Sequence, residues 1–145
     1  MNKEEIILAT LASGNDNNTF YSPVKIQKLF FLIDKNLAEK FGGALFNFEP
    51  YHYGPFDREV YNEFAKLKIK DKVETTISPQ ENFNKYKLTN KGFEEGKILL
   101  EKLSPDVKDY ITNLNSFVLS LSFTELVGAI YKEYPEMKVN SIFNK

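Results

Sequence analysis

The chain has 145 residues, of which 42% are apolar, 14% aromatic and 27% charged, and its formal net charge is −1. A chain of this length is predicted to form one domain over residues 1–145, with a core that needs no crosslinks. Cysteine is absent and histidine occurs once, which excludes disulfides, thiolate metal centres, cysteine nucleophiles and multi-histidine metal sites. The balanced charge by itself predicts neither a nucleic acid nor an acidic partner.

The sequence contains no signal for a membrane protein. Its apolar runs are shorter than the roughly 20 residues that span a bilayer. Acidic residues stand near the N-terminus, where a secretory signal carries basic ones. We therefore expect a cytoplasmic protein with no membrane partner.

Two helices are predicted at the start of the chain. The first covers residues 3–13 and ends in a polar turn. The second, over residues 22–41, has the stronger pattern, because Ser22 and the proline after it begin a run of apolar residues at helical spacing. Phe31 and Leu32 lie off the main apolar stripe of this helix, which predicts burial on two sides.

An extended segment is predicted next. Residues 45–53 alternate loosely between apolar and polar, and Pro50 is expected to break any strand there. The glycine and proline at residues 54–55 predict a turn. A helix is then expected over residues 57–67, with an aspartate as its N-cap.

The middle of the chain predicts a β-hairpin. Two strands are expected over residues 73–77 and 85–88, with a polar loop over residues 78–84 between them. A helix followed directly by such a hairpin is the arrangement of a winged-helix unit. We therefore predict a mainly α fold with a small β-hairpin, that is, a winged-helix-like helical domain with extra C-terminal helices.

Three further helices are predicted to begin at Thr89, Ser104 and Ser122. Gly96 in the first of them favours close packing, and Pro135 is expected to end the last. Helical periodicity does not say whether the helices after Ser104 pack on their own core or exchange between two subunits. A homodimer is therefore one expected state, and a monomer is the other.

The densest unusual segment covers residues 49–58. It gathers three aromatic residues, the only histidine, the only arginine, two prolines and a glycine. Aromatic residues and arginine are enriched where protein interfaces derive most of their affinity. We predict that this turn and the exposed side of the 22–41 helix bind a protein partner through Lys25, Lys28, Tyr51, His52, Tyr53, Gly54, Pro55, Phe56, Arg58 and Tyr61. Alternatively, the aromatic residues only seal the core where the chain enters the next helix.

A basic run offers a different interpretation. If the hairpin is the wing of a DNA-binding regulator, lysines beside it would contact the phosphate backbone: Lys66, Lys68, Lys70, Lys72, Lys85 and Lys87. The alternative is an ordinary solvated surface, since acidic residues are interspersed and the net charge is slightly negative.

Motifs of common enzyme classes are absent from the sequence. It has no Gly-x-Ser-x-Gly turn, no phosphate-binding glycine loop and no His-Glu-x-x-His. We therefore expect no enzyme, no cofactor and no metal site. A nuclease-like enzyme with a carboxylate-bound metal is a more distant hypothesis, because aspartate and glutamate suffice to hold magnesium.

Several short motifs follow one another along the chain: SPVKIQKLFF at residues 22–31, YHYGPF at 51–56, VY at 60–61, YKLTNKG at 86–92 and YKEYP at 131–135. Together they resemble the Panacea or SocA-like antitoxin domain and the related YwgA-like bacterial proteins. The family pattern is a Lys-Leu-Gln-Lys-Leu-like helix, an aromatic-Tyr-Gly-Pro turn and a Val-Tyr helix. Ile26 stands where leucine is frequent, and Phe56 where valine is common.

The resemblance implies a small, mostly helical domain without catalysis. For Panacea antitoxins it implies direct neutralisation of a partner toxin, and for SocA an adaptor that delivers a toxin to a protease. For YwgA-like proteins it implies only a helical domain. We therefore expect a non-enzymatic antitoxin or adaptor that binds a toxin protein, with the winged-helix DNA-binding regulator as the alternative.

Overall fold

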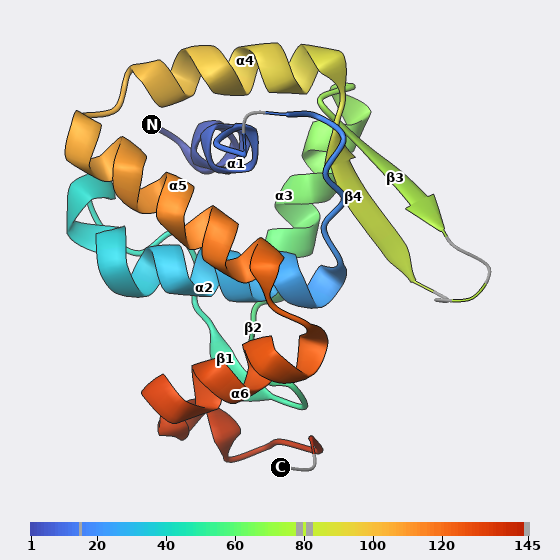
Figure 1. Cartoon of the computed structure of the whole chain (residues 1–145), viewed down its shortest axis with the longest axis vertical. Coiled ribbons are helices and arrows are strands. Elements are labelled where there is room, and N and C mark those ends of the chain that lie inside the picture. Colours follow the sequence, from blue (N-terminus) through green and yellow to red (C-terminus); the bar gives the residue numbers. More distant parts are fainter. Residues whose placement is uncertain (15, 78–79, 81–82, 144–145) are drawn as a thin grey trace.

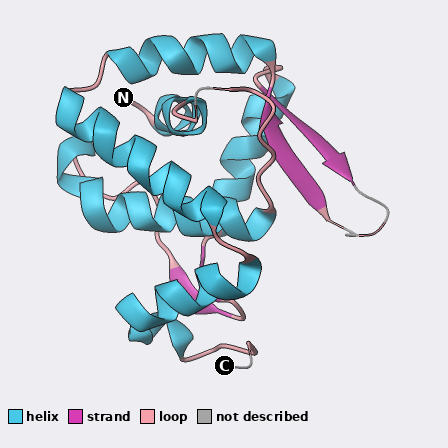
Figure 2. Ribbon diagram, in the orientation of Figure 1, coloured by secondary structure: helices cyan, strands magenta, loops and turns pink. Residues whose placement is uncertain are grey.

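We describe the chain from a computed structural model, in which residues 1–14, 16–77, 80 and 83–143 are described. These residues form α-helices, short 3₁₀ helices and two antiparallel hairpins (Figures 1 and 2). In chain order the elements are α1 Lys3–Ala12, α2 Pro23–Leu37, η1 Ala38–Phe41, β1 Glu49–Tyr51, β2 Gly54–Phe56, α3 Arg58–Ile69, β3 Val73–Ile77, β4 Asn84–Leu88, α4 Asn90–Glu101, α5 Pro105–Ser120, α6 Phe123–Glu133 and η2 Pro135–Lys138. The predicted mainly α fold with a small hairpin is confirmed.

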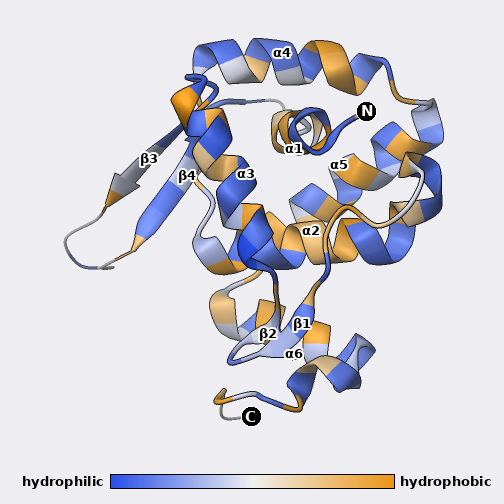
Figure 3. Cartoon of the chain, turned by 180° about the vertical axis from the view of Figure 1, so that it is seen from behind, coloured by the Kyte–Doolittle hydropathy of each residue, from blue (hydrophilic) through white to orange (hydrophobic). Residues whose placement is uncertain are grey.

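Helix α1 lies at the centre of the molecule, with α2, α3, α4 and α5 around it (Figure 1). Every residue from Ile6 to Ala12 is buried. Helix α4 approaches α1 at Gly96, where a β-carbon would clash with the carbonyl oxygen of Leu8. The close packing expected of this glycine is confirmed. The outer helices α3 and α4 alternate hydrophobic and hydrophilic residues, as helices with one buried face do (Figure 3).

Helix α2 begins where the sequence predicts, because the Ser22 hydroxyl accepts a backbone N–H of the first turn. Phe31 and Leu32 are 1% and 8% exposed, which confirms burial on two sides of the helix. The α-helix is one turn shorter than predicted. Its last predicted residues form the 3₁₀ helix η1, which ends at Gly42 with a left-handed φ of 81°.

The hairpin predicted in the middle of the chain is confirmed. In β3 and β4, Val73 pairs with Leu88 at the base of the hairpin. Four residues of the expected polar loop (78, 79, 81 and 82) lie outside the described residues. Between α1 and α2, Tyr21 exchanges two backbone hydrogen bonds with Tyr86 of β4, at 2.8 and 2.9 Å. The order is thus helix, bridge, helix, helix and hairpin, with β1 and β2 inserted between α2 and α3. That the unit is a winged helix stays a prediction.

A second hairpin forms where the sequence predicts a broken segment and a turn. Strands β1 and β2 pair antiparallel, with Pro50 opposite Pro55, and the two-residue loop is formed by residues 52–53. The expectations that Pro50 breaks the strand and that residues 54–55 are the turn were therefore wrong. In a two-stranded hairpin every strand is an edge strand, so a proline without an N–H is tolerated. Gly54 follows the loop with a φ of 103°.

The last helices pack on the core of their own chain. Ile111, Val118 and Leu126 of α5 and α6 are fully buried, and α6 ends before Pro135 as predicted. Helix α6 and η2 lie beside β1 and β2 (Figure 1). A homodimer stays an untested expectation. Among the residues that the structure describes, no helix is long and apolar enough to cross a membrane.

Candidate functional site

The β1–β2 hairpin carries most of the residues predicted to bind a partner, and it lies between α2 and α6 (Figure 1). Its glycine and proline, Gly54 and Pro55, are buried. Tyr51 and Tyr53 are 48% and 39% exposed, and His52 is exposed as well. The hairpin therefore turns its backbone toward the core and several of its rings toward solvent.

Two neighbouring side chains of α2 hold the backbone of this hairpin. The Gln27 amide donates to the carbonyl oxygen of Asp57 at 3.0 Å, and its oxygen accepts the Asp57 N–H at 3.0 Å. Lys28 Nζ donates to the carbonyl oxygen of Pro55 at 3.4 Å. Asp57 in turn caps α3 by accepting the N–H of Glu59. The helix motif and the Tyr-Gly-Pro motif are therefore parts of one hydrogen-bonded unit.

Lys28 was expected on the exposed side of its helix, and this was wrong. It is only 3% exposed, because the hairpin covers the face of α2 from which it projects. Burial lowers the pKa of the Lys28 ammonium to about 7. Among the described residues no carboxylate forms an ion pair with it. The lysine is thus a buried donor to backbone rather than a surface cation.

Gly54 is favoured in this buried unit by its backbone conformation rather than by a lack of space. A β-carbon at this position would lie 3.5 Å from Cε of Lys28 and 3.4 Å from Cε1 of Tyr131 on α6. The hydroxyl of Tyr131 is buried and has no hydrogen-bond partner among the described residues. The φ of 103° at Gly54 is what favours glycine, since other residues are strained there. Lys28, Gly54 and Tyr131 therefore tie α2, the hairpin and α6 together.

The exposed rings of the hairpin begin a series of aromatic contacts that reaches β4. The centroid distances are 4.2 Å for Tyr51–His52, 5.0 Å for Tyr51–Phe56, 5.8 Å for Phe56–Tyr61 and 6.5 Å for Tyr61–Tyr86. Burial raises the pKa of Tyr61 to about 12, so its hydroxyl stays neutral at physiological pH. We define the hairpin face as Tyr51, His52, Phe56, Arg58 and Tyr61. Arg58 is exposed at the first turn of α3.

The C-terminal segment holds the tip of the same hairpin from the other side. The Ile142 N–H donates to the carbonyl oxygen of His52 at 2.9 Å, and the Asn140 amide donates to that of Pro50 at 3.1 Å. The Phe143 ring lies 5.8 Å from that of Phe123. These contacts could not be predicted from the sequence, because they involve backbone atoms and no motif marks their donors. The hairpin is therefore supported by both α2 and the chain end.

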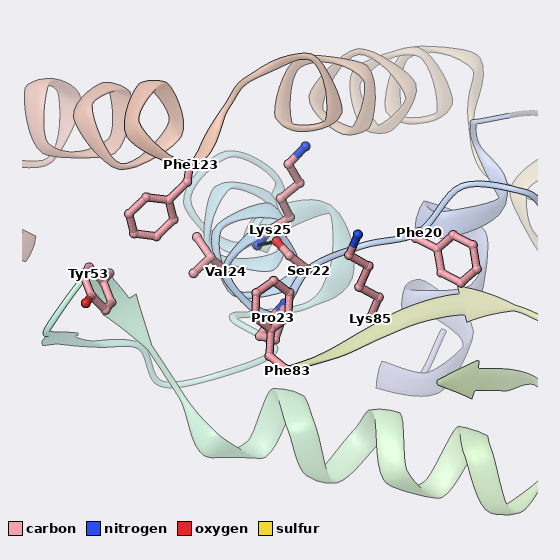
Figure 4. Close-up of a pocket in the computed structure, with 9 residues that line it drawn as sticks. All are labelled: Phe20, Ser22, Pro23, Val24, Lys25, Tyr53, Phe83, Lys85 and Phe123. Atoms are coloured by element: carbon pink, nitrogen blue, oxygen red, sulfur yellow. Dashed lines mark hydrogen bonds between the residues drawn. The ribbon is translucent and has the colours of Figure 1, made fainter. Parts of the chain in front are cut away.

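Tyr53 and Lys25 lie apart from the hairpin face, at a hollow of about 680 Å³ (Figure 4). The Tyr53 ring contacts that of Phe123 at 5.2 Å. Lys25 Nζ donates to the carbonyl oxygen of Leu119 at 3.1 Å, and partial burial lowers its pKa. The sequence signalled neither Phe123 nor the two other rings of this hollow, Phe20 and Phe83, because they come from three distant segments. The predicted partner-binding residues are thus divided between the hairpin face, the hollow and the buried unit.

The lysines of the DNA-binding alternative lie on and near the β3–β4 hairpin, and most are neutralised within the chain. Four form ion pairs: Lys66–Glu63, Lys70–Glu4, Lys72–Glu95 and Lys87–Glu74. Lys68 donates to the Thr75 hydroxyl at 2.9 Å. Lys85 instead lines the hollow. This surface therefore alternates in charge, which disfavours a continuous track for a phosphate backbone.

A carboxylate metal centre has no support in the described part of the chain. No group of three or more histidine, cysteine, aspartate or glutamate residues there is placed to hold a metal ion. The nuclease hypothesis therefore finds no site among these residues.

A comparison with protein families assigns the chain to a family. The family model of the antitoxin SocA-like, Panacea domain matches residues 26–143, and the chain belongs to this family. The match includes Gln27, Lys28, the hairpin and the C-terminal segment that supports it. No curated protein and no solved structure matched the chain. Membership of this family indicates a role in a toxin–antitoxin system, with a protein as partner.

Proposed function

We propose that this chain acts as one domain that binds a toxin protein and neutralises it by contact, without catalysis. The observation that carries the proposal is a hairpin whose backbone is fixed by Lys28 and Gln27 while its rings stay exposed. Tyrosine and arginine are the residues from which interfaces derive most of their affinity. A surface ordered before binding also loses little conformational entropy when a partner docks. Family membership supports a toxin as that partner.

The hairpin face would form the centre of the proposed interface. Tyr51 contributes an exposed ring and Arg58 an exposed guanidinium, and both types of side chain can anchor a partner. The Tyr51 ring is held in place because it stacks on His52 and Phe56, and Phe56 in turn meets Tyr61 edge to face. Buried Gly54, Pro55 and Lys28 would act indirectly by positioning this face.

The experiment begins with the tagged chain in its native host. Proteins that co-purify after nuclease treatment are identified, and each candidate is expressed alone and together with the chain in a second bacterial host. A toxin should arrest growth alone and lose this effect with the wild-type chain. The double variant Tyr51→Ala/Arg58→Ala should restore growth arrest, and Tyr110→Ala, which removes an exposed tyrosine of α5, should not. Full neutralisation by a folded Tyr51→Ala/Arg58→Ala protein would contradict the proposed surface.

One observation keeps a DNA-binding regulator as the second candidate. The order helix, bridge, helix, helix and hairpin follows the winged-helix arrangement, with Tyr21 and Tyr86 forming the bridge. The internal ion pairs of its lysines make this candidate the weaker one. In the same experiment, recovery of nucleic acid and loss of all protein partners after nuclease treatment would favour DNA binding.

A further inference from the structure

The hollow beside Tyr53 is built from segments that meet only in the folded chain. Its rings come from the segment before α2, the tip of the β1–β2 hairpin, the residue before β4 and the first residue of α6 (Figure 4). These rings, Phe20, Tyr53, Phe83 and Phe123, are each between 38% and 42% exposed. Partly exposed aromatic rings around a hollow form a surface that an apolar side chain of another protein can fill.

Two lysines line the hollow. Among the described residues that line it are Lys25 and Lys85, and no acidic residue is among them. Lys25 Nζ is held by the carbonyl oxygen of Leu119, and no carboxylate of the described chain forms an ion pair with it. Burial lowers the pKa of this ammonium, as expected for a cation that has lost water without gaining an anion. A carboxylate of a binding partner would supply the missing counter-charge for the Lys25 ammonium.

We propose that this hollow binds a peptide segment of the partner protein in which a large apolar side chain stands next to an aspartate or glutamate. The apolar side chain would pack against the joined rings of Tyr53 and Phe123, and the carboxylate would pair with Lys25. The inference rests on the proposed function, because it assigns this segment to the toxin. It extends the interface from the hairpin face to the other side of the hairpin, where Tyr53 points to the hollow (Figure 4).

The test uses a phage-displayed library of random peptides, selected on the full wild-type chain. Enriched peptides should share an aromatic or large aliphatic residue beside an acidic one. Their dissociation constants, measured by fluorescence polarisation, should rise by about tenfold for Phe123→Ala and for Lys25→Glu. Lys25→Gln removes the charge and keeps an N–H donor on a side chain one bond shorter, so it should weaken binding with little effect on folding. Matched controls are Phe117→Ala, with 45% exposure on α5, and Lys132→Glu on α6.

Three results would overturn the inference. The first is a lack of enriched peptides, or enrichment of basic ones. The second is equal binding by wild type and the folded Phe123→Ala and Lys25→Gln variants. The third is a wild-type dimer that Phe123→Ala converts to a monomer, since a second copy would then cover the hollow. Peptide binding by a chain that neutralises no toxin would instead contradict the proposed function and leave the hollow as a peptide site.

Discussion

The two hairpins of this chain are supported in different ways. In the β1–β2 hairpin, side chains of α2 and the C-terminal segment bond directly to backbone atoms. The β3–β4 hairpin projects from the body of the molecule (Figure 1). Only Val73 and Leu88 at its base are buried, and Ile77 near its tip is 63% exposed. The first hairpin is therefore held along its backbone by two distant segments. The second is held at its buried base, by the Tyr21–Tyr86 bridge and by contacts with α3.

The lysines near the two hairpins also differ in their partners and in their burial. Lys28 beneath the first is buried against a carbonyl oxygen, and Lys25 nearby also donates to a carbonyl. Lys87 on the second is paired with Glu74 at 3.4 Å on an exposed surface. Exposed pairs contribute little free energy, while a desolvated cation interacts strongly with any anion that reaches it. The short β1–β2 hairpin, which has fewer lysines, is therefore the better candidate for specific binding.

The largest effect is expected at the base of the second hairpin. A β-carbon at Gly92 in α4 would overlap the carbonyl oxygen of Lys72, which immediately precedes β3. We predict that Gly92→Ala lowers the free energy of unfolding by about 3 kcal/mol, because backbone must move to admit the methyl group. Urea unfolding followed by circular dichroism measures this change.

The control for this variant lies in α6. Nothing stands within 4 Å of a β-carbon at Gly128, so Gly128→Ala should raise stability by about 0.5–1 kcal/mol through helix propensity. Unchanged stability of Gly92→Ala would show that α4 does not close on the hairpin base as the structure has it.

The second prediction compares two glycines with positive φ. Gly54→Ala places a methyl group at a φ of 103° against Lys28 and Tyr131, and we predict a loss of about 2 kcal/mol in stability. It should also abolish toxin binding, because the hairpin face must shift. Gly43→Ala imposes similar strain at a φ of 133° with nothing within 4 Å, so it should lower stability and keep toxin binding. Isothermal calorimetry with the purified toxin measures binding; parallel losses in both variants would contradict a positioning role of Gly54.

The third prediction concerns the buried lysine. The pKa of Lys28 is lowered from 10.5 to about 7 by burial, so between these values the unfolded chain binds its proton and the folded chain releases it. Stability should therefore rise with pH across this window, by about 2 kcal/mol from pH 7 to pH 9. Urea unfolding at several pH values measures the slope. Lys28→Met should remove the rise, and Lys132→Met on the surface of α6 should keep it. An identical slope in wild type and Lys28→Met would assign the rise to other groups.

Local patterns predicted much of the fold. The cap of α2 at Ser22, the hairpin from Val73 to Leu88 and the capping box formed by Ser122 and Glu125 are all set by neighbours in sequence. Two-sided burial of α2 was also predicted, because Phe31 and Leu32 are recognisable as off-stripe apolar residues. In each case the residues that determine the structure lie within one turn or one strand pair of each other.

The candidate site was predicted only in part, because its geometry depends on long-range packing. Lysine is rarely buried, so Lys28 suggested a surface residue, although it shares a helix face with Leu32 four positions later. The hairpin that covers this face comes later in the sequence. Pro50 and Pro55 led to the prediction of a broken segment and a turn in place of β1 and β2. The pairing of these two strands becomes apparent only in the folded chain. Phe123 belongs to a capping-box segment without a functional motif, and only folding brings it to Tyr53.

The smallest effect is expected on the outer surface of the second hairpin. Lys68 donates to Thr75, and Lys87 forms a partly exposed pair with Glu74. We predict that Lys68→Ala/Lys87→Ala changes stability by less than about 1 kcal/mol and leaves toxin binding unchanged, because exposed pairs are screened by water. A DNA-binding wing would behave differently: removal of two phosphate contacts would weaken duplex binding and reduce its dependence on salt by about one counterion per lysine. Fluorescence polarisation with a random-sequence duplex at several salt concentrations distinguishes these cases. If the wild type binds the duplex and the double variant loses both affinity and salt dependence, the second hairpin and not the first is the functional one.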